Sequence, residues 1–295
     1  MDYFKLPTEK QNPKTTHLDT RPVKEILRLI AREDESIHRA LKKVEPSIAR
    51  AVRLIRSSLK KGGRLFLVGA GTSGRLAVME AAECPPTFNT PSSLVQAVMA
   101  GGKRAVFRSQ EGAEDRTLEA KREMKKKIKR GDVVVGISAS GVTPFVRASL
   151  EEAKKRKAST ILIACNFSSS LRSLVDVVIA PRVGPEVIAG STRLKAGTAT
   201  KLILNRLTVT SMIQLGKVYG NLMVDLQPRS RKLKARGLRI LKELGGISDQ
   251  KARAVFRKAE GQLKTAVLMA RKNLSYREAR ERLREARGFL RKALQ

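Results

Sequence analysis

The chain has few of the side chains from which metal centres, disulfide scaffolds and base-stacking surfaces are built. Its 295 residues include no tryptophan, three tyrosines, two histidines and two cysteines. Two cysteines, Cys84 and Cys165, cannot make a disulfide scaffold and indicate a reducing compartment. His17 and His38 are too few for a metal site, so we expect no metal.

Long apolar segments are missing as well. The longest apolar runs are short stretches such as VVVGI, well under the roughly 18–20 residues that cross a bilayer. The first thirty residues are polar until their end and lack the apolar core of a secretion signal. We therefore expect a cytoplasmic protein without a membrane span.

Acidic residues are scarce, since 27 Asp and Glu stand against 61 Lys and Arg, a formal net charge of +34. Such a charge first suggests a nucleic acid or another polyanion as partner. However, few aromatic residues can stack on bases, no DNA-reading motif is visible, and the basic residues are spread along the chain. We therefore do not expect a nucleic-acid partner. The excess of basic residues either steers an anionic substrate or belongs to solvated faces such as 121–130 and 229–295.

The order of the periodic patterns predicts an α/β fold. Apolar residues recur at helical spacing over 20–57, where Thr20 and Pro22 mark a start. Short β-rich runs then alternate with helical stretches, which is typical of a parallel sheet covered by helices on both faces. The predicted strands are 65–68, 94–98, 133–137, 160–164 and 175–179. We also expect a long helix over about 195–224 and three more over 245–295, where Ser275 and Glu278 form a capping box before the last.

Two loops that follow predicted strands have the composition of anion sites. The first, GAGTSG at 69–74, opens a helix and offers backbone N–H groups to an anion. It also fits the dinucleotide pattern G-x-G-x-x-G, but residues 84–110 contain no acidic residue to hold ribose hydroxyls. The second loop, SASGVTP at 138–144, is rich in hydroxyls, and Thr143 with Pro144 suits a helix start.

Because the carboxyl ends of parallel strands share one edge of a sheet, we expect these two loops to converge. Hydroxyls and backbone amides suit one phosphate monoester better than a pyrophosphate, although either loop alone could be a capped tight turn. The sequence thus favours a phosphosugar-type site. Its candidate binding residues are Gly71, Thr72, Ser73, Ser138, Ser140 and Thr143.

These loops carry a resemblance to a known family. GAGTSGRL (69–76) and GISASG (136–141) resemble the SIS (sugar isomerase) domain, a parallel sheet that binds phosphosugars. Further segments make the chain similar, from about residue 8 to its C-terminus, to the N-acetylmuramic acid 6-phosphate etherase family. These segments are TEKQNPKTTHLD (8–19), ECPPTF (83–88), EGAED (111–115), VGPEVIAGSTRLKAGTATKLILN (183–205) and GKVYGNLMVDLQ (216–227).

The resemblance implies an α/β, SIS-type three-layer sandwich with a small C-terminal three-helix unit like a ubiquitin-associated domain. On this basis we divide the chain into a helical arm packing on the core (1–55), a phosphosugar-binding domain (56–240) and the three-helix unit (241–295). It also implies a phosphosugar substrate, no metal, no dissociable cofactor, and a homodimer with its active site near the interface.

The implied reaction releases D-lactate from the 3-position of a muramic acid phosphate and gives N-acetylglucosamine 6-phosphate. In the open-chain sugar the C2 proton is α to an aldehyde and the lactyl ether is β to it. Elimination followed by water addition therefore needs a base at C2 and an acid at the ether oxygen, roles that two carboxyl groups can fill. The resemblance assigns the acid to Glu83 and a second acid/base role to Glu114.

Other residues near these motifs have two readings each. In the segment PEVIAGSTRLKAG, candidates for substrate or interface contacts are Glu186, Ser191, Arg193 and Lys195. Arg75 either contacts phosphate or faces solvent. We interpret Cys84 as a small packed residue. The prolines at 85–86 are expected to end the helix that begins at the first loop.

The chain departs from the family's usual pattern at four places, one of which is the run Phe107-Arg108-Ser109-Gln110 before EGAED, where small aliphatic residues are usual. Glu80-Ala81-Ala82 stands where Asp-Ala-Ser is usual, Val142 where Arg is usual, and Phe167 where Pro is usual. The missing arginine bears on substrate affinity and removes neither carboxylate.

Two alternative functions stay open. One is a phosphosugar isomerase, although the matched segments are those of the etherase. The other is a regulator resembling glucokinase regulatory protein, which binds phosphosugars without turnover. Such regulators carry two sugar domains, whereas one is visible here, and the presence of both Glu83 and Glu114 favours an enzyme.

Overall fold

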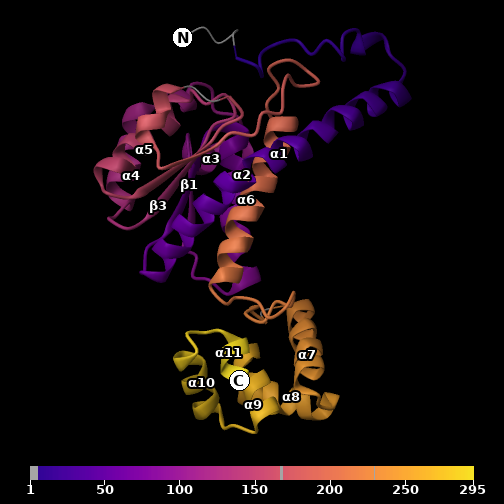
Figure 1. Cartoon of the computed structure of the whole chain (residues 1–295), viewed down its shortest axis with the longest axis vertical. Coiled ribbons are helices and arrows are strands. Elements are labelled where there is room, and N and C mark those ends of the chain that lie inside the picture. The colour runs from indigo at the N-terminus through magenta and orange to yellow at the C-terminus, as the bar shows by residue number, and fades with distance from the viewer. Residues whose placement is uncertain (1–5, 167–168, 229) are drawn as a thin grey trace. The chain divides into compact units, whose positions relative to one another are not determined.

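A computed structural model of the chain describes residues 6–166, 169–228 and 230–295, so Phe167 lies outside the described residues. By their contacts, the residues form two compact units. The sheet unit comprises Met1–Ala82 and Ser93–Thr208, and the helical unit comprises Glu83–Ser92 and Val209–Gln295. Helices α2 (Gly71–Phe88) and α6 (Lys195–Gln214) contribute residues to both units (Figure 1).

The sheet unit is built on five parallel strands in the order β2-β1-β3-β4-β5. All five predicted strands are found, with ends shifted by at most two residues. Every residue of β1 and β3 is buried, as expected for strands covered on both faces. Their bounds are β1 Leu65–Gly69, β2 Val95–Met99, β3 Val133–Ile137, β4 Ser159–Ile163 and β5 Val177–Ile179.

Helices cover both faces of this sheet. On one face, α4 (Thr117–Lys127) and α5 (Pro144–Lys155) pack Met124 and Leu150 into a cluster with Phe66 and Val68 of β1. The other face is in contact with α1 (Val23–Lys60) at β3 and β5 (Figure 1). The predicted α/β, three-layer architecture is confirmed. Short elements complete the unit: η2 Leu18–Thr20, α3 Gly102–Phe107, η3 Ala113–Asp115 and η4 Ser169–Leu174.

Helix α1 is one continuous helix of 38 residues, with Pro46 inside it. Its predicted apolar stripe is buried from Ile37 to Ile55. Before that stripe, however, Val23 and Leu27 are 74% and 61% exposed and share a face with Ile30. The start of α1 therefore presents an apolar face that the described residues leave uncovered.

Two predicted helix ends are wrong. Helix α2 continues through Pro85 and Pro86, because a proline carbonyl still accepts hydrogen bonds: Asn89 N–H donates to Pro85 O at 2.9 Å. Helix α6 ends at Gln214 instead of about 224. Gly216 there adopts φ +76°, the left-handed conformation that commonly ends helices.

The helical unit packs its helices around α9, whose Leu263, Ala266 and Val267 are buried. Where we predicted three helices over 245–295, the structure has four. The capping box of Ser275 and Glu278 is confirmed, but it begins α10 rather than the last helix. The helices are α7 Arg231–Gly245, α8 Asp249–Lys258, α9 Leu263–Lys272, α10 Tyr276–Glu285 and α11 Leu290–Leu294.

Candidate active site

The two candidate phosphate loops follow neighbouring strands. β1 and β3 are paired in parallel, with Gly69 beside Ile137 at their carboxyl ends. The strand order also reverses here, since β2 lies on one side of this pair and β4 on the other. The crevice at such a reversal is where open α/β sheets bind ligands, so the loops converge at the expected edge.

The first loop is shaped by tight packing between strand and helix. A Cβ on Gly74 would lie 2.8 Å from Gly69 O and 2.7 Å from Met99 Cγ, so only glycine fits without displacement. This brings the first turn of α2 directly onto the end of β1. Thr72 and Ser73 are half-buried in that turn, and their own N–H groups have no partner within the helix, whereas Gly74 N–H donates to Ala70 O at 3.1 Å. The loop can therefore offer both hydroxyls and amides to an anion.

Several polar groups of the second loop are hydrogen-bonded to one another. Ser138 is buried, and its Oγ lies 2.8 Å from Thr143 Oγ1 and 3.3 Å from Ser140 Oγ, while Gly141 N–H donates to it at 3.0 Å. Ser140 and Thr143 remain half-buried at the N-terminus of α5. Ser138 thus holds the loop in shape, and Ser140 and Thr143 are better placed to meet a ligand.

Glu114 lies beside the first loop. It belongs to η3, where buried Ala113 anchors the turn and Glu114 is exposed. A cavity of about 170 Å³ is lined by both Glu114 and Gly71. Arg75 also lines it, but its Nε donates to Val106 O at 2.9 Å, so it fastens α3 to α2. One predicted carboxylate is therefore next to one predicted phosphate loop.

Glu83 is exposed on α2 and lies twelve residues after Gly71, more than three helical turns along the same helix. Cys84 beside it is buried, in agreement with its interpretation as a packed residue. Glu83 and Gly71 are thus well separated along one helix.

Two of the four candidates between 186 and 195 have contacts that stabilise the framework of the fold. Glu186 is fully buried, and its two carboxylate oxygens accept from the N–H groups of Lys195 and Ala196 at 2.8 and 2.9 Å, which caps the start of α6. Lys195 is 1% exposed and donates to Glu33 of α1 at 2.6 Å. Ser191 is half-buried in a turn before α6, and Arg193 is exposed. A substrate contact by Glu186 or Ser191 stays a prediction.

The pKa values of the buried carboxyls follow from these contacts. Burial alone would raise the pKa of Glu33, but hydrogen bonds from Lys195 and Asn12 outweigh it, so the pKa is lowered. For Glu186, burial dominates over the backbone N–H groups and raises the pKa.

A second cavity of about 450 Å³ adjoins the second loop. It is lined by Ser140 and Val142 from that loop, by Asn166 after β4, by Thr8, and by exposed Arg182. The sequence reasoning missed Thr8, Asn166 and Arg182. The available signal was Asn166, a polar residue two positions after the apolar run TILIA (160–164). Arg182 places a cation at the cavity that Val142 also lines.

One departure from the family pattern has a structural explanation. Glu80 is buried, accepts from Lys201 Nζ at 2.6 Å and from the hydroxyl of Thr208, and so joins α2 to α6. Glutamate at this position therefore belongs to a buried ion pair of the sheet unit.

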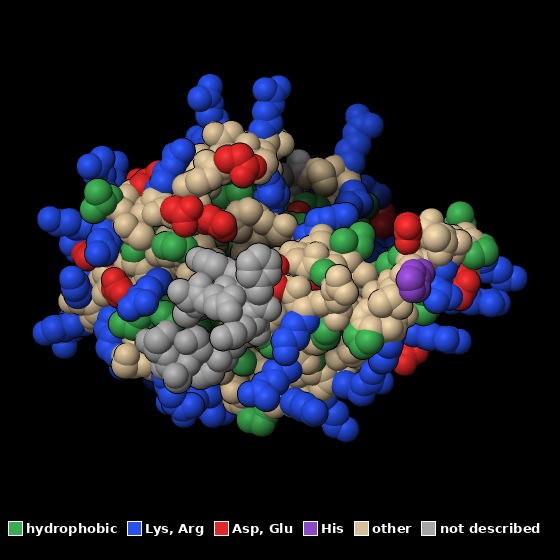
Figure 2. Space-filling model, turned by 90° about the horizontal axis from the view of Figure 1, so that it is seen from above, with side chains coloured by type: hydrophobic (Ala, Val, Ile, Leu, Met, Phe, Trp, Pro, Cys, Tyr) green, Lys and Arg blue, Asp and Glu red, His purple; other side chains and the backbone are tan. Residues whose placement is uncertain are grey.

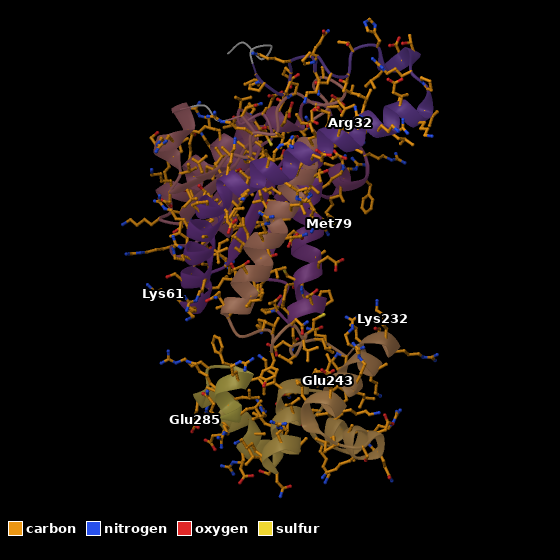
Figure 3. All side chains as sticks on the ribbon, turned by 45° about the vertical axis from the view of Figure 1, so that its right-hand side comes forward. Arg32, Lys61, Met79, Lys232, Glu243 and Glu285 are labelled. Carbon is orange, nitrogen blue, oxygen red and sulfur yellow. The ribbon has the colours of Figure 1, made fainter. Side chains whose placement is uncertain are left out.

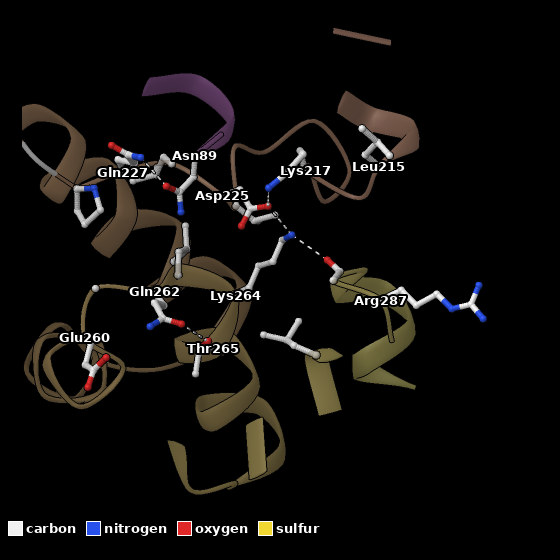
Figure 4. A pocket seen from close by; sticks show the side chains of 17 residues that line it. Asn89, Leu215, Lys217, Asp225, Gln227, Glu260, Gln262, Lys264, Thr265 and Arg287 are labelled. Carbon is white, nitrogen blue, oxygen red and sulfur yellow. Dashed lines mark hydrogen bonds and ion pairs between the residues drawn. The ribbon is translucent and has the colours of Figure 1, made fainter. Parts of the chain in front are cut away.

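A cavity of about 550 Å³ lies within the helical unit (Figure 4). Lys264 reaches into it and is almost fully buried. It donates to Asp225 at 2.6 Å and to the carbonyls of Gly216 and Gly288 at 2.8 Å each. Burial lowers the pKa of Lys264 despite the charge of Asp225. All three donors of the ammonium are used, so Lys264 is a structural contact.

The basic charge covers the surface broadly. Lys and Arg side chains surround the face drawn in Figure 2 instead of gathering in one patch. Arg32, Lys61 and Lys232 are exposed examples (Figure 3). Within 6–166, 169–228 and 230–295, no helix is both long and apolar enough to span a membrane. The same residues contain no cluster of three or more His, Cys, Asp or Glu suited to a metal ion.

The fold, a parallel sheet covered by helices with two hydroxyl-bearing loops at one edge, is that of an SIS-type α/β protein, and family models agree. Residues 114–210 match the SIS domain, and residues 47–154 match the glucokinase regulatory protein N-terminal SIS domain. A solved phosphoheptose isomerase from Francisella tularensis is 20% identical, with a TM-score of 0.48 over 64% of this chain and 98% of that chain.

Closer relatives identify the family. The N-acetylmuramic acid 6-phosphate etherase of Geobacillus thermodenitrificans is 47% identical over 291 residues, which cover 98% of this chain and 99% of the relative. That of Salinibacter ruber is 47% identical over 98% of this chain and 94% of the relative. The chain belongs to the N-acetylmuramic acid 6-phosphate etherase family.

Proposed function

We propose that this protein is a carbon–oxygen lyase that cleaves the D-lactyl ether of N-acetylmuramic acid 6-phosphate. The family relationship over nearly the whole chain carries this proposal. The placement of Glu114 beside Gly71 in one cavity supports it, because a phosphosugar held at the first loop would lie near a carboxyl group. The products are N-acetylglucosamine 6-phosphate and D-lactate, as expected for recycling of cell-wall amino sugars.

The phosphate would be held at the sheet edge by the loop hydroxyls and amides of Thr72, Ser73, Ser140 and Thr143. A carboxylate removes the C2 proton of the open-chain sugar, the C3–O bond breaks, and a carboxylic acid protonates the departing lactate oxygen. Water then adds its hydroxyl at C3 of the double bond, and C2 regains a proton. We assign the acid to Glu83 and a second acid/base role to Glu114.

We further propose a homodimer that completes this site. Glu83 stands more than three turns along α2 from the loop at its start, and it is exposed. A second copy of the chain could supply one of the two carboxyl groups to each site. The apolar face of Val23, Leu27 and Ile30 at the start of α1 is a surface for such pairing. Leu27→Glu should then give a monomer by light scattering and lower turnover.

The domain roles and the compartment are also proposals. We propose that residues 56–240 bind the phosphosugar, that 1–55 form an arm on this core, and that the C-terminal helices from 241 form a small unit like a ubiquitin-associated domain. We place the protein in the cytoplasm.

One assay tests the function directly: purified protein is incubated with N-acetylmuramic acid 6-phosphate, and D-lactate is measured with time. Release of one D-lactate per N-acetylglucosamine 6-phosphate supports the lyase. Binding of the phosphosugar without any release contradicts it and supports a non-catalytic regulator, the function suggested by the match to the glucokinase regulatory protein domain.

A further inference from the structure

The cavity beside the second loop contains a polar atom that its surroundings do not satisfy. Asn166 is at least nine-tenths buried and lines the cavity. Its Nδ2 donates to Thr8 Oγ1 at 2.6 Å. Among the residues that the structure describes, its Oδ1 has no hydrogen-bond partner and is shielded from solvent. A buried oxygen of this kind costs free energy unless a donor is supplied, so a bound N–H group is what this position lacks.

The wall of this cavity is hydrogen-bonded to the second phosphate loop and packs against it. The N–H groups of Cys165 and Asn166 both donate to Ala139 O, at 3.1 and 3.2 Å. A Cβ on Gly141 would lie only 2.1 Å from Asn166 O, so loop and cavity wall are in direct contact. Ser140 lines the cavity and belongs to the loop. A sugar held at this loop by its phosphate would therefore lie next to the cavity that Asn166 lines.

The remaining walls are mainly apolar. Leu6, Pro7, Val142, Cys165 and Val183 line the cavity. Burial, together with the nearby charge of Glu186, raises the pKa of Cys165 to about 12, so its thiol stays neutral at physiological pH. The cavity thus suits a small apolar group attached to a single N–H donor.

We propose that this cavity binds the 2-acetamido group of the sugar, with its N–H donating to Asn166 Oδ1 and its methyl group against Val142 and Val183. The inference rests on the proposed function and adds a specificity-determining residue to it. Thr8 holds the Asn166 amide in place and is a positioning residue. The N-terminal segment is itself fastened over the sheet unit, because Gly190 N–H donates to Thr8 O at 3.1 Å and Thr15 Oγ1 donates to Val187 O at 2.9 Å.

The test compares the affinities for two phosphosugars by titration calorimetry. N-acetylglucosamine 6-phosphate carries the acetamido group, and 2-deoxyglucose 6-phosphate lacks both the donor and the methyl group. In the wild type the first should bind at least about tenfold more tightly, the factor that one satisfied buried hydrogen bond provides. In Asn166→Ala this ratio should fall to about two.

Two further variants distinguish recognition of the acetamido group by Asn166 from a general effect of the substitution on the structure. Asn166→Asp keeps an acceptor oxygen, so the ratio should stay near tenfold even though its charge weakens binding of both phosphates. Asn205→Ala removes an asparagine of α6 that accepts from Lys201 outside the cavity, and it should leave the ratio unchanged. Thermal unfolding of each variant shows whether it is folded.

If Asn166→Ala weakens both ligands by the same factor, Asn166 only shapes the loop and the inference is overturned. The same holds if Asn166→Asp loses the preference as completely as Asn166→Ala. If the wild type releases no D-lactate from N-acetylmuramic acid 6-phosphate, the proposed function itself fails, so the two failures are distinguishable.

Discussion

Two regions of the sheet unit use carboxylates in opposite ways. At the carboxyl edge of β1, Glu114 is exposed and lines an open cavity. Beneath the N-terminal segment, Glu33 and Glu186 are buried and their oxygens are bonded to Lys195 and to the N–H groups of α6. Such paired, desolvated carboxylates fix helices in place, whereas exposed ones are free to exchange protons with a substrate. Burial and partners therefore separate framework glutamates from candidate catalytic ones.

The largest effect on the free energy of unfolding should come from removing the cation of the buried ion pair between Lys195 and Glu33. Lys195→Met leaves Glu33 without its buried cation, so the free energy of unfolding should drop by about 3–5 kcal/mol in urea denaturation. Lys14 is the matched control, since its Nζ also lies near Glu33, at 3.4 Å, but its side chain is 73% exposed. Lys14→Met should cost less than about 1 kcal/mol. Equal costs for the two variants would contradict the comparison.

Substitution of the exposed glutamates Glu83 and Glu114 should change the rate of D-lactate release and leave the free energy of unfolding nearly unchanged. Glu83→Gln and Glu114→Gln should each lower kcat for D-lactate release by about 100-fold, because a general acid or base is lost. The free energy of unfolding should change by less than about 0.5 kcal/mol. Glu111→Gln alters another exposed carboxylate of the cavity that Glu114 lines and should lower kcat less than about threefold. Near-normal rates in both main variants would remove the acid/base assignment.

The pH dependence of stability should report on the buried region. The pKa of Glu33 is lowered from its ordinary 4.5 in the folded chain. Its ionised form therefore stabilises the fold above about pH 4.5, and this contribution is lost as the pH falls through the lowered pKa. Urea denaturation between pH 3 and pH 6 should show a steeper loss of stability for the wild type than for Glu33→Gln. Parallel curves would mean that Glu33 has the same pKa folded and unfolded.

The smallest effect should come from salt. Because basic side chains surround the face in Figure 2 and are not focused on one patch, we expect little steering of the anionic substrate. From 50 to 500 mM NaCl, kcat/KM should change by less than about threefold. A steep fall would show that the +34 charge draws substrate toward the site.

Much of the framework could be predicted from the sequence because its signals are local. The strands were found since parallel strands buried on both faces are uninterrupted apolar runs, as in β3. The loops were found because glycines and hydroxyls directly follow β1 and β3. The end of α6 was missed because apolar residues continue beyond Gly216, and α7 was missed because its basic composition hides its apolar face.

The parts that could not be predicted depend on residues far apart in the chain. Lys195 and Glu33 are 162 positions apart, and nothing in either segment indicates that they form an ion pair. The same is true of Asn166 and Thr8, which are 158 positions apart. Glu186 and Lys195 were candidates for ligand contacts because both are polar residues in a matched segment. Their burial and their hydrogen bonds to the start of α6 and to Glu33 depend on the fold and could not be read from the sequence.

Lys264 has a consequence for how the helical unit unfolds. Its ammonium donates to the carbonyls of Gly216 and Gly288 and to the side chain of Asp225, so it ties the 216–225 segment and the turn at Gly288 to α9. Neither segment can leave without removing a hydrogen-bond partner from a buried positive charge. The helical unit should therefore lose its structure in one cooperative step, with amide hydrogens of α9 and of the 216–225 segment exchanging at a common rate.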